Sequence, residues 1–361
     1  MKDETEHFLF NHALENRRER KMANHRKQKK KWLVAVLGLA LAFAAAGCGS
    51  GGGAPDGGAA AEPPTASGSA PSGQSAGAAE KRTAYPFTVK DATGREFVFE
   101  KAPERIASTS PSETEMLFAL GLGDKVVGVS DFCDYPEEAK SKPKLGSITK
   151  PNEEALIGAG ADLVLTGVSM KLPTVEKLRE LKVPLFKVEP KTVDDVMNNL
   201  LMMGQIFDKQ ERAEELVAEM KAERQKVVDA VKDLKPEERK KVFFEFSPGW
   251  TVGKGEFLDE LIQLAGGINV AGEEQGYVQI SEEKVIADNP QVILYPEGII
   301  DDQSKKPMDQ LIRERSGWGK IDAVKNDRLA GVDKDVVSRP GPRIMQGLTE
   351  IAKGIYPELV K

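Results

Sequence analysis

Few residues of this 361-residue chain could act as nucleophiles or metal ligands, and most of them lie near its start. The three histidines, His7, His12 and His25, fall within the first 25 residues, and the two cysteines are Cys48 and Cys133. If the N-terminal segment is removed, no imidazole remains for Ser-His-Asp or Cys-His chemistry, or for a histidine-ligated metal. Cys133 then stands alone, which is more typical of a small buried apolar residue than of a nucleophile. We therefore expect a binding protein and not an enzyme.

Sequence motifs and charge exclude further classes of function. The stretch 249–255, GWTVGKG, has the wrong spacing for a phosphate-binding P-loop, and 121–123 lacks the third glycine of a dinucleotide-binding turn. Of 51 basic and 57 acidic side chains, 10 and 5 lie in residues 1–48, so residues 49–361 carry a net charge of −11. Such an acidic body disfavours nucleic acid as a partner, because nucleic-acid binding requires a basic surface.

The N-terminal segment has the pattern of an export signal. A basic run at 26–31, RKQKKK, precedes 15 uncharged apolar residues at 32–46, which is shorter than the roughly 20 residues needed to span a bilayer. The alternative is an uncleaved signal anchor. Residues 49–84 are dominated by Gly, Ala, Ser and Pro, a composition that predicts a disordered tether. We therefore expect a signal peptide over 1–48 that ends at Cys48.

From Tyr85 the chain alternates short apolar runs with helical segments, a pattern typical of parallel sheets covered by helices. The predicted strands are 87–89, 96–99, 105–108, 126–129, 163–166, 184–188, 242–246, 292–295 and 328–332. The predicted helices include 192–207, 209–233, 256–265, 281–287 and 343–355. Helix 209–233 would be roughly 37 Å long. The fold class is therefore α/β, with an N-terminal lobe over 85–190, helices over 191–235 and a C-terminal lobe over 236–361. One long helix bridges the two lobes, and a ligand cleft lies between them.

An internal pseudo-repeat supports two related lobes. Residues 152–166, NEEALIGAGADLVLT, align without gaps with 281–295, SEEKVIADNPQVILY. Each copy predicts a polar cap, two glutamates, a short helix and a buried strand. Acidic residues stabilise the first turn of a helix through its dipole, which explains one acid per copy but does not require two. One acid of each pair could therefore have a partner outside the protein.

Several stretches together resemble the substrate-binding lipoproteins of ABC importers for cobalamin and ferric siderophores. They are RIASTSPSETEMLFALGLGDKVVGVSDFCDYP (105–136), NEEALIGAGADLVL (152–165), EFLDELIQLAGGINVAG (256–272), SEEKVIADNPQVIL (281–294) and RPGPRIMQGLTEIA (339–352). The resemblance implies the two-lobed fold with a single bridging helix. It also implies that Glu154 and Glu283 dock on arginines of the dimeric permease, and that Cys48 is the lipid attachment site. At Cys48 the family usually has Leu three residues earlier, where this chain has Ala45.

The resemblance implies a ligand site at loops that follow the strands. The expected ligand-binding residues are Ser110, Phe132 and Thr149 on one rim, and Trp250, Tyr277 and Arg339 on the other. Core packing is the alternative for Phe132, Trp250 and Tyr277. For Arg339 a structural ion pair is equally open, and for Arg343 the structural interpretation is favoured.

The resemblance implies that the ligand is a metal chelate. The absence of histidine adds that the body cannot ligate cobalt or iron through imidazole, so the metal must arrive inside the chelate. Asp134-Tyr135-Pro136 favours a cobalamin-type corrinoid, and a ferric siderophore or haem is the alternative. No cofactor is expected. The expected partners are an ABC permease dimer with its ATPase subunits and, through the lipid anchor, the outer face of the cytoplasmic membrane. The protein is expected to be a monomer. The competing function of another class is a membrane-anchored sensor without transport.

Overall fold

The computed structural model of the protein describes residues 81–301 and 304–360. The expected signal peptide, Cys48 and the expected tether as far as residue 80 lie outside the described residues. At the end of the expected tether, the Lys81 ammonium pairs with Glu214, Arg82 pairs with Asp208 at 2.8 Å, and the Thr83 backbone N–H donates to Asp208. No helix within the described ranges is long and apolar enough to cross a membrane.

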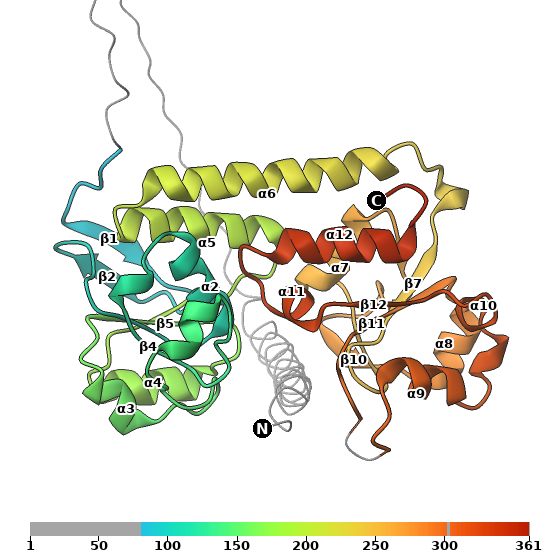
Figure 1. Ribbon diagram of the computed structural model, residues 1–361, viewed down its shortest axis with the longest axis horizontal. Helices are drawn as coiled ribbons and strands as arrows, with labels where there is room; N and C mark the ends of the chain where they lie inside the picture. The colour runs from blue at the N-terminus through green and yellow to red at the C-terminus, as the bar shows by residue number, and fades with distance from the viewer. Residues whose placement is uncertain (1–80, 302–303, 361) are drawn as a thin grey trace, which may run out of the picture. The chain divides into compact units, whose positions relative to one another are not determined.

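The N-terminal lobe is built on a parallel sheet with strand order β4-β3-β5-β6 (Figure 1). Its strands are β3 (Ile106–Ser108), β4 (Val126–Val129), β5 (Leu163–Thr166) and β6 (Leu185–Lys187). Its helices are α2 (Pro111–Ala119), α3 (Glu153–Gly158) and α4 (Leu172–Glu180). An antiparallel hairpin, β1 (Phe87–Lys90) with β2 (Glu96–Phe99), stands apart from this sheet. The strands of the parallel sheet are almost wholly buried, as expected for continuous apolar runs covered on both faces.

The C-terminal lobe repeats this architecture with strand order β12-β11-β7-β9. Its strands are β7 (Lys241–Phe244), β9 (Ile268–Asn269), β11 (Val292–Pro296) and β12 (Leu329–Val332). Its helices are α7 (Phe257–Leu264), α8 (Glu282–Asp288), α9 (Met308–Glu314), α10 (Asp322–Lys325), α11 (Lys334–Ser338) and α12 (Ile344–Ile355). The sequence did not predict β9, nor the antiparallel pair β8 (Trp250–Val252) and β10 (Tyr277–Gln279). Short 3₁₀ turns lie at Gly123–Lys125, Glu137–Ser141, Pro236–Glu238 and Trp318–Lys320.

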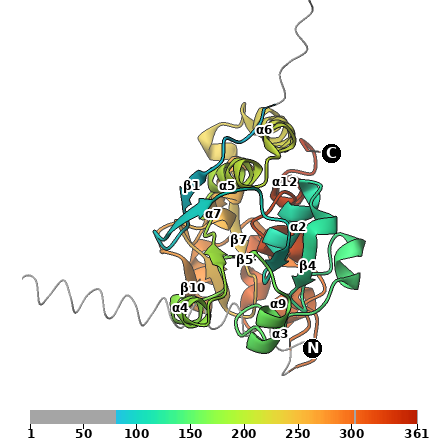
Figure 2. The same cartoon turned by 90° about the vertical axis from the view of Figure 1, so that its left-hand side faces the viewer.

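Two helices pack along one side of the lobes, and the longer one alone spans both lobes (Figure 1). Helix α5 (Val193–Ile206) begins with a reciprocal capping box between Thr192 and Asp195. Helix α6 (Gln210–Val231) contains 22 residues and is therefore roughly 33 Å long, slightly shorter than predicted. The two helices pack side by side in both views (Figures 1 and 2), and α12 also packs on α6. A single bridging helix between two α/β lobes was predicted from the sequence and is confirmed.

One hydrophobic core continues from the N-terminal lobe through the connecting helices into the C-terminal lobe. Phe186 lies on the N-terminal sheet, Met203 on α5, Leu216 on α6 and Phe244 on the C-terminal sheet, and all belong to this cluster. Each lobe also contains one smaller hydrophobic cluster under its outer helices. Since the lobes share buried apolar surface as well as a helix, the hydrophobic effect holds them together along this side.

The pseudo-repeat folds as predicted in both lobes. Asn152 accepts a hydrogen bond from the Ala155 backbone at the start of α3, and Ser281 accepts one from Lys284 at the start of α8. Strands β5 and β11 follow these helices, and each pairs in parallel with a strand on either side. The two copies therefore occupy equivalent places in the two lobes.

Candidate functional site

A pocket lies between the two lobes. The N-terminal side is formed by residues that follow β5 and β6, and the C-terminal side by residues near the ends of β7 and β11 together with α7, β10 and α11. The lining residues are Val168, Glu189, Pro190, Lys191, Phe244, Phe246, Glu256, Phe257, Leu258, Tyr277, Pro296, Ile299, Lys334, Val337 and Ser338. The carboxyl ends of parallel strands are the usual ligand site of such sheets. The cleft between lobes predicted from the sequence is thus present.

The pocket has an aromatic wall on its C-terminal side. The Tyr277 ring meets the Phe246 ring edge to face, with centroids 5.1 Å apart and planes at 84°. Burial, reinforced by the charge of Glu256, raises the pKa of the Tyr277 phenol, which is therefore neutral at physiological pH. Phe244 and Phe257 extend the apolar surface. This wall suits the flat or bulky organic body of a ligand.

The charged groups of the pocket are balanced between acids and bases. Glu189 and Glu256 line the pocket together with Lys191 and Lys334. Burial raises the pKa of Glu256, with Glu189 adding to the shift and Lys191 opposing it. Behind the pocket, the ammonium of Lys187 lies 3.3 Å from the Glu189 carboxylate and donates to the Gly167 carbonyl at 3.0 Å.

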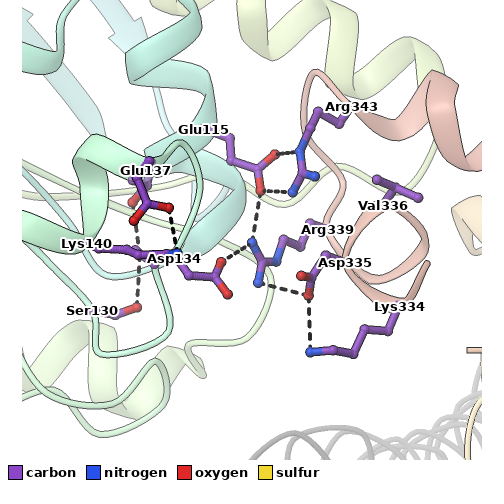
Figure 3. Close-up of polar contacts among 12 residues, drawn as sticks. Glu115, Ser130, Asp134, Glu137, Lys140, Lys334, Asp335, Val336, Arg339 and Arg343 are labelled. Atoms are coloured by element: carbon purple, nitrogen blue, oxygen red, sulfur yellow. Dashed lines mark hydrogen bonds and ion pairs between the residues drawn. The ribbon is translucent and has the colours of Figure 1, made fainter. Parts of the chain in front are cut away.

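An ion-pair cluster joins the lobes beside this pocket (Figure 3). Glu115, on α2 of the N-terminal lobe, accepts from Arg343 at 2.6 and 2.8 Å and from Arg339 at 3.1 Å. Arg339 also pairs with Asp134 at 2.7 Å and with Asp335 at 2.9 Å. Burial opposes the charge of Arg339, but the three carboxylates outweigh burial and raise the pKa of this guanidinium. Arg339 therefore stays charged and holds the two lobes in register.

Arg343 has a structural role, as its place before the last helix predicted. Its hydrogen bonds to Glu115 raise the pKa of its guanidinium. The same guanidinium stacks over the Tyr135 ring, with its central carbon 3.9 Å from the ring centroid. Tyr135 belongs to the Asp-Tyr-Pro sequence, so both Asp134 and Tyr135 contact arginines of the opposite lobe.

Of the residues predicted to bind ligand, Tyr277 lines the pocket. Trp250 lies on β8, paired with Gln279 two residues beyond Tyr277, and packs partly buried against the main core. Ser110 is buried as the N-cap of α2, while Phe132 and Thr149 are half-buried in loops that do not contribute to the pocket lining. The structure thus brings only part of the expected set to one place.

Ser110 lies beside a buried carboxyl group that the sequence did not single out. Glu113 is 1% exposed, and one of its carboxyl oxygens has no hydrogen-bond partner. Burial raises the pKa of Glu113 to about 7, against the opposing effects of the Ser110 hydroxyl and Lys187. A side chain at Gly167 would place its Cβ 2.5 Å from this oxygen, so glycine is required opposite Glu113.

The predicted docking acids lie on the surface of α3 and α8. Within each pair, the first acid has a partner inside its own lobe: Glu153 pairs with Lys177, and Glu282 lies 3.6 Å from Arg315. Glu154 and Glu283 are exposed and have no partner among residues 81–301 and 304–360. The two helices lie one in each lobe, away from α6 (Figure 1).

A family model described as "Periplasmic binding protein" matches residues 106–336. An uncharacterized ABC transporter substrate-binding lipoprotein of Bacillus subtilis, YvrC, is 33% identical over 291 residues, which cover 79% of this chain and 90% of that protein. A cobalamin-binding protein of Halobacterium salinarum is 27% identical, with coverage of 77% of this chain and 76% of that protein.

A solved structure has the same fold over most of the chain. It is that of a possible iron-binding, periplasmic solute-binding protein from Staphylococcus epidermidis, with a TM-score of 0.62 and 34% identity. The match covers 71% of this chain and all of that protein. The two-lobed α/β fold is therefore shared with extracytoplasmic binding proteins.

Proposed function

We propose that this chain, which belongs to the periplasmic binding protein family and is related to a substrate-binding lipoprotein of an ABC transporter, captures a metal chelate and delivers it to an ABC importer. The observation that carries the chelate proposal is the pocket between the lobes. Four aromatic residues line it, Phe244, Phe246, Phe257 and Tyr277. Two glutamates and two lysines also contribute to the lining. Such a surface can bury an organic ligand body and still hydrogen-bond to its polar edge.

A cobalamin-type corrinoid is the favoured ligand, and a ferric siderophore or haem is the alternative. The similarity to a cobalamin-binding protein of Halobacterium salinarum supports the corrinoid. The similarity to a possible iron-binding protein of Staphylococcus epidermidis supports the siderophore. The protein needs no resident cofactor for this role, since the metal arrives already chelated.

A binding titration tests the chelate proposal. The purified full-length chain is titrated with cyanocobalamin, a ferric tris-hydroxamate, a ferric tris-catecholate and haem, and tryptophan fluorescence is followed. Trp250 lies on the strand that pairs with β10, so a ligand against Tyr277 should change its emission. Saturable binding of one chelate supports the proposal, and the absence of any response to all four would reject it.

We further propose that Glu154 and Glu283 dock the protein on the permease. A two-fold permease presents the same basic surface twice, and each lobe offers one exposed, unpaired acid on equivalent helices. Charge pairs of this kind set orientation and association rate more than affinity. The combined Glu154→Ala and Glu283→Ala substitutions should abolish uptake by whole cells and leave chelate affinity unchanged.

The matched control replaces exposed acids elsewhere on each lobe, Glu180→Ala with Glu273→Ala, and should leave uptake normal. Loss of chelate binding by the purified docking variant, or normal uptake by cells that carry it, would contradict the docking role.

Anchoring through Cys48 is part of the same proposal. Several acyl chains on this residue would hold the protein stably on the outer face of the cytoplasmic membrane, whereas one chain would not. Cys48→Ala should move the protein from the membrane fraction to the soluble extracytoplasmic fraction. Retention of this variant in the membrane fraction would argue for a different anchor.

A further inference from the structure

We infer that the pocket selects an electrically neutral or cationic chelate and discriminates against polyanionic ones. This inference rests on the proposed function and deepens it, because it names the charge class of the ligand. The observation behind it is that, among residues 81–301 and 304–360, the cations in and around the pocket are equalled in number by carboxylates of the same protein.

Arg339 follows the lining residues Val337 and Ser338, and its guanidinium is already paired with carboxylates. Its two terminal nitrogens contact Glu115 at 3.1 Å, Asp134 at 2.7 Å and Asp335 at 2.9 Å. The Arg339 side chain is 11% exposed, so three acids rather than water surround it. An anionic ligand would have to displace these bonds and would then sit against the same carboxylates. Repulsion between like charges at such distances in a partly buried site opposes this.

Arg343 offers no alternative anion site. Its Nε and one terminal nitrogen bind both oxygens of Glu115, a two-point arrangement that satisfies the guanidinium on one edge. The Tyr135 ring covers one face of the same group. Both arginines of the 339–343 stretch therefore act between the lobes and not toward the ligand.

The lysines of the pocket are similarly balanced. Lys191 and Glu256 both line the pocket, where the charge of Lys191 opposes the effect of burial on the pKa of Glu256, and Lys334 lies 3.7 Å from Asp335. Lys187, behind the pocket, pairs with Glu189. The pocket and its border thus contain five carboxylates, Glu115, Asp134, Glu189, Glu256 and Asp335, against five cations, Lys187, Lys191, Lys334, Arg339 and Arg343.

This arrangement suits a ligand whose polar edge consists of neutral groups. Amide N–H groups can donate to carboxylates such as Glu256, and the oxygens of amide or iron-bound hydroxamate groups can accept from Lys191, without adding net charge. A ferric tris-catecholate or haem brings several negative charges, for which the pocket provides no surplus cation. The apolar wall would bind the body of either ligand, so the discrimination must come from charge.

The experiment compares chelates of different charge on the purified full-length chain. Cyanocobalamin and a cationic ferric tris-hydroxamate are titrated against a ferric tris-catecholate and haem at one salt concentration. We expect at least one of the first two to bind at least tenfold more tightly than either anion. In the double variant Asp134→Asn and Asp335→Asn, two carboxylates no longer neutralise Arg339, and affinity for the catecholate should rise at least tenfold.

The matched control is Asp229→Asn, which removes an exposed acid that pairs with Lys232 on α6, and it should change no affinity. If the catecholate or haem binds most tightly to the unaltered protein, the charge inference is wrong while the chelate-receptor proposal stands. An unchanged catecholate affinity in the double variant would also overturn it. If none of the four chelates binds, the proposed function itself fails.

Discussion

The replacement Glu115→Gln should measurably destabilise the protein, because this one carboxylate joins two arginines of the other lobe. The Glu115 side chain is 2% exposed, and those of Arg339 and Arg343 are 11% and 16% exposed. A glutamine can still accept through its oxygen, but its amide nitrogen faces a guanidinium donor, and the negative charge is lost. Arg339 keeps Asp134 and Asp335, whereas Arg343 loses its carboxylate partner.

Removing one partner of a buried ion pair lowers the free energy of unfolding by about 3 kcal/mol or more. The unfolding entropy of a body of about 280 residues is roughly 0.6 kcal/mol per kelvin near the melting temperature. Dividing the first value by the second predicts a decrease in Tm of about 5 °C. Differential scanning calorimetry of the full-length chain at pH 7 measures this decrease directly.

Two controls make the result specific to the cluster. Glu223→Gln removes an exposed acid that pairs with Lys226 on α6, and it should lower the Tm by less than about 1 °C. In a double-mutant cycle, Glu115→Gln with Arg343→Gln should be less destabilising than the sum of the single changes by at least about 1 kcal/mol. A Tm shift for Glu115→Gln as small as the control, or full additivity in the cycle, would refute the role assigned to this ion pair.

Two further predictions concern packing and pH. Gly204→Ala should cost about 1–3 kcal/mol, measured by urea unfolding, since its Cβ would lie 2.6 Å from that of Ala213 where α5 meets α6; stability equal to that of the unaltered chain would contradict this. For Glu113, burial raises the folded pKa from 4.5 to about 7, so its contribution to stability is full below about pH 4.5 and is lost as the pH rises through 7. Glu113→Gln should therefore be more stable than the unaltered protein by roughly 3 kcal/mol above pH 7 and equal to it near pH 4 in thermal unfolding; a difference that does not change with pH would contradict the assignment.

The sequence predicted the sheets and the long helices because their signals are local. The apolar run at Leu163–Thr166 and the cap at Thr192 can be recognised without knowledge of any other part of the chain. Strands β8 and β10 were missed because each has three residues, and 24 residues separate Val252 from Tyr277, its ladder partner. Their pairing depends on contacts between distant segments, which periodicity does not report.

The sequence predicted where the ligand pocket lies but only some of the residues that line it. Its position follows from the rule that parallel strands present ligands at their carboxyl ends. Its lining includes Glu256 and Val337, which neither motif nor periodicity distinguished, because only the facing of two lobes brings them together. The same reason left the role of Arg339 open in the sequence: its partners Glu115 and Asp134 lie more than 200 residues earlier.

Each copy of the pseudo-repeat has two adjacent glutamates in the first turn of its helix. The helix dipole explains one acid in each copy of the repeat but does not require the second. Successive helical residues point about 100° apart, so two adjacent side chains cannot both face the same neighbour. Glu153 and Glu282 turn toward cations of their own lobes, and this leaves Glu154 and Glu283 directed away from those cations. An internal ion pair thus explains the first acid of each pair, and the second acid is the one that we propose for contact with a symmetric permease.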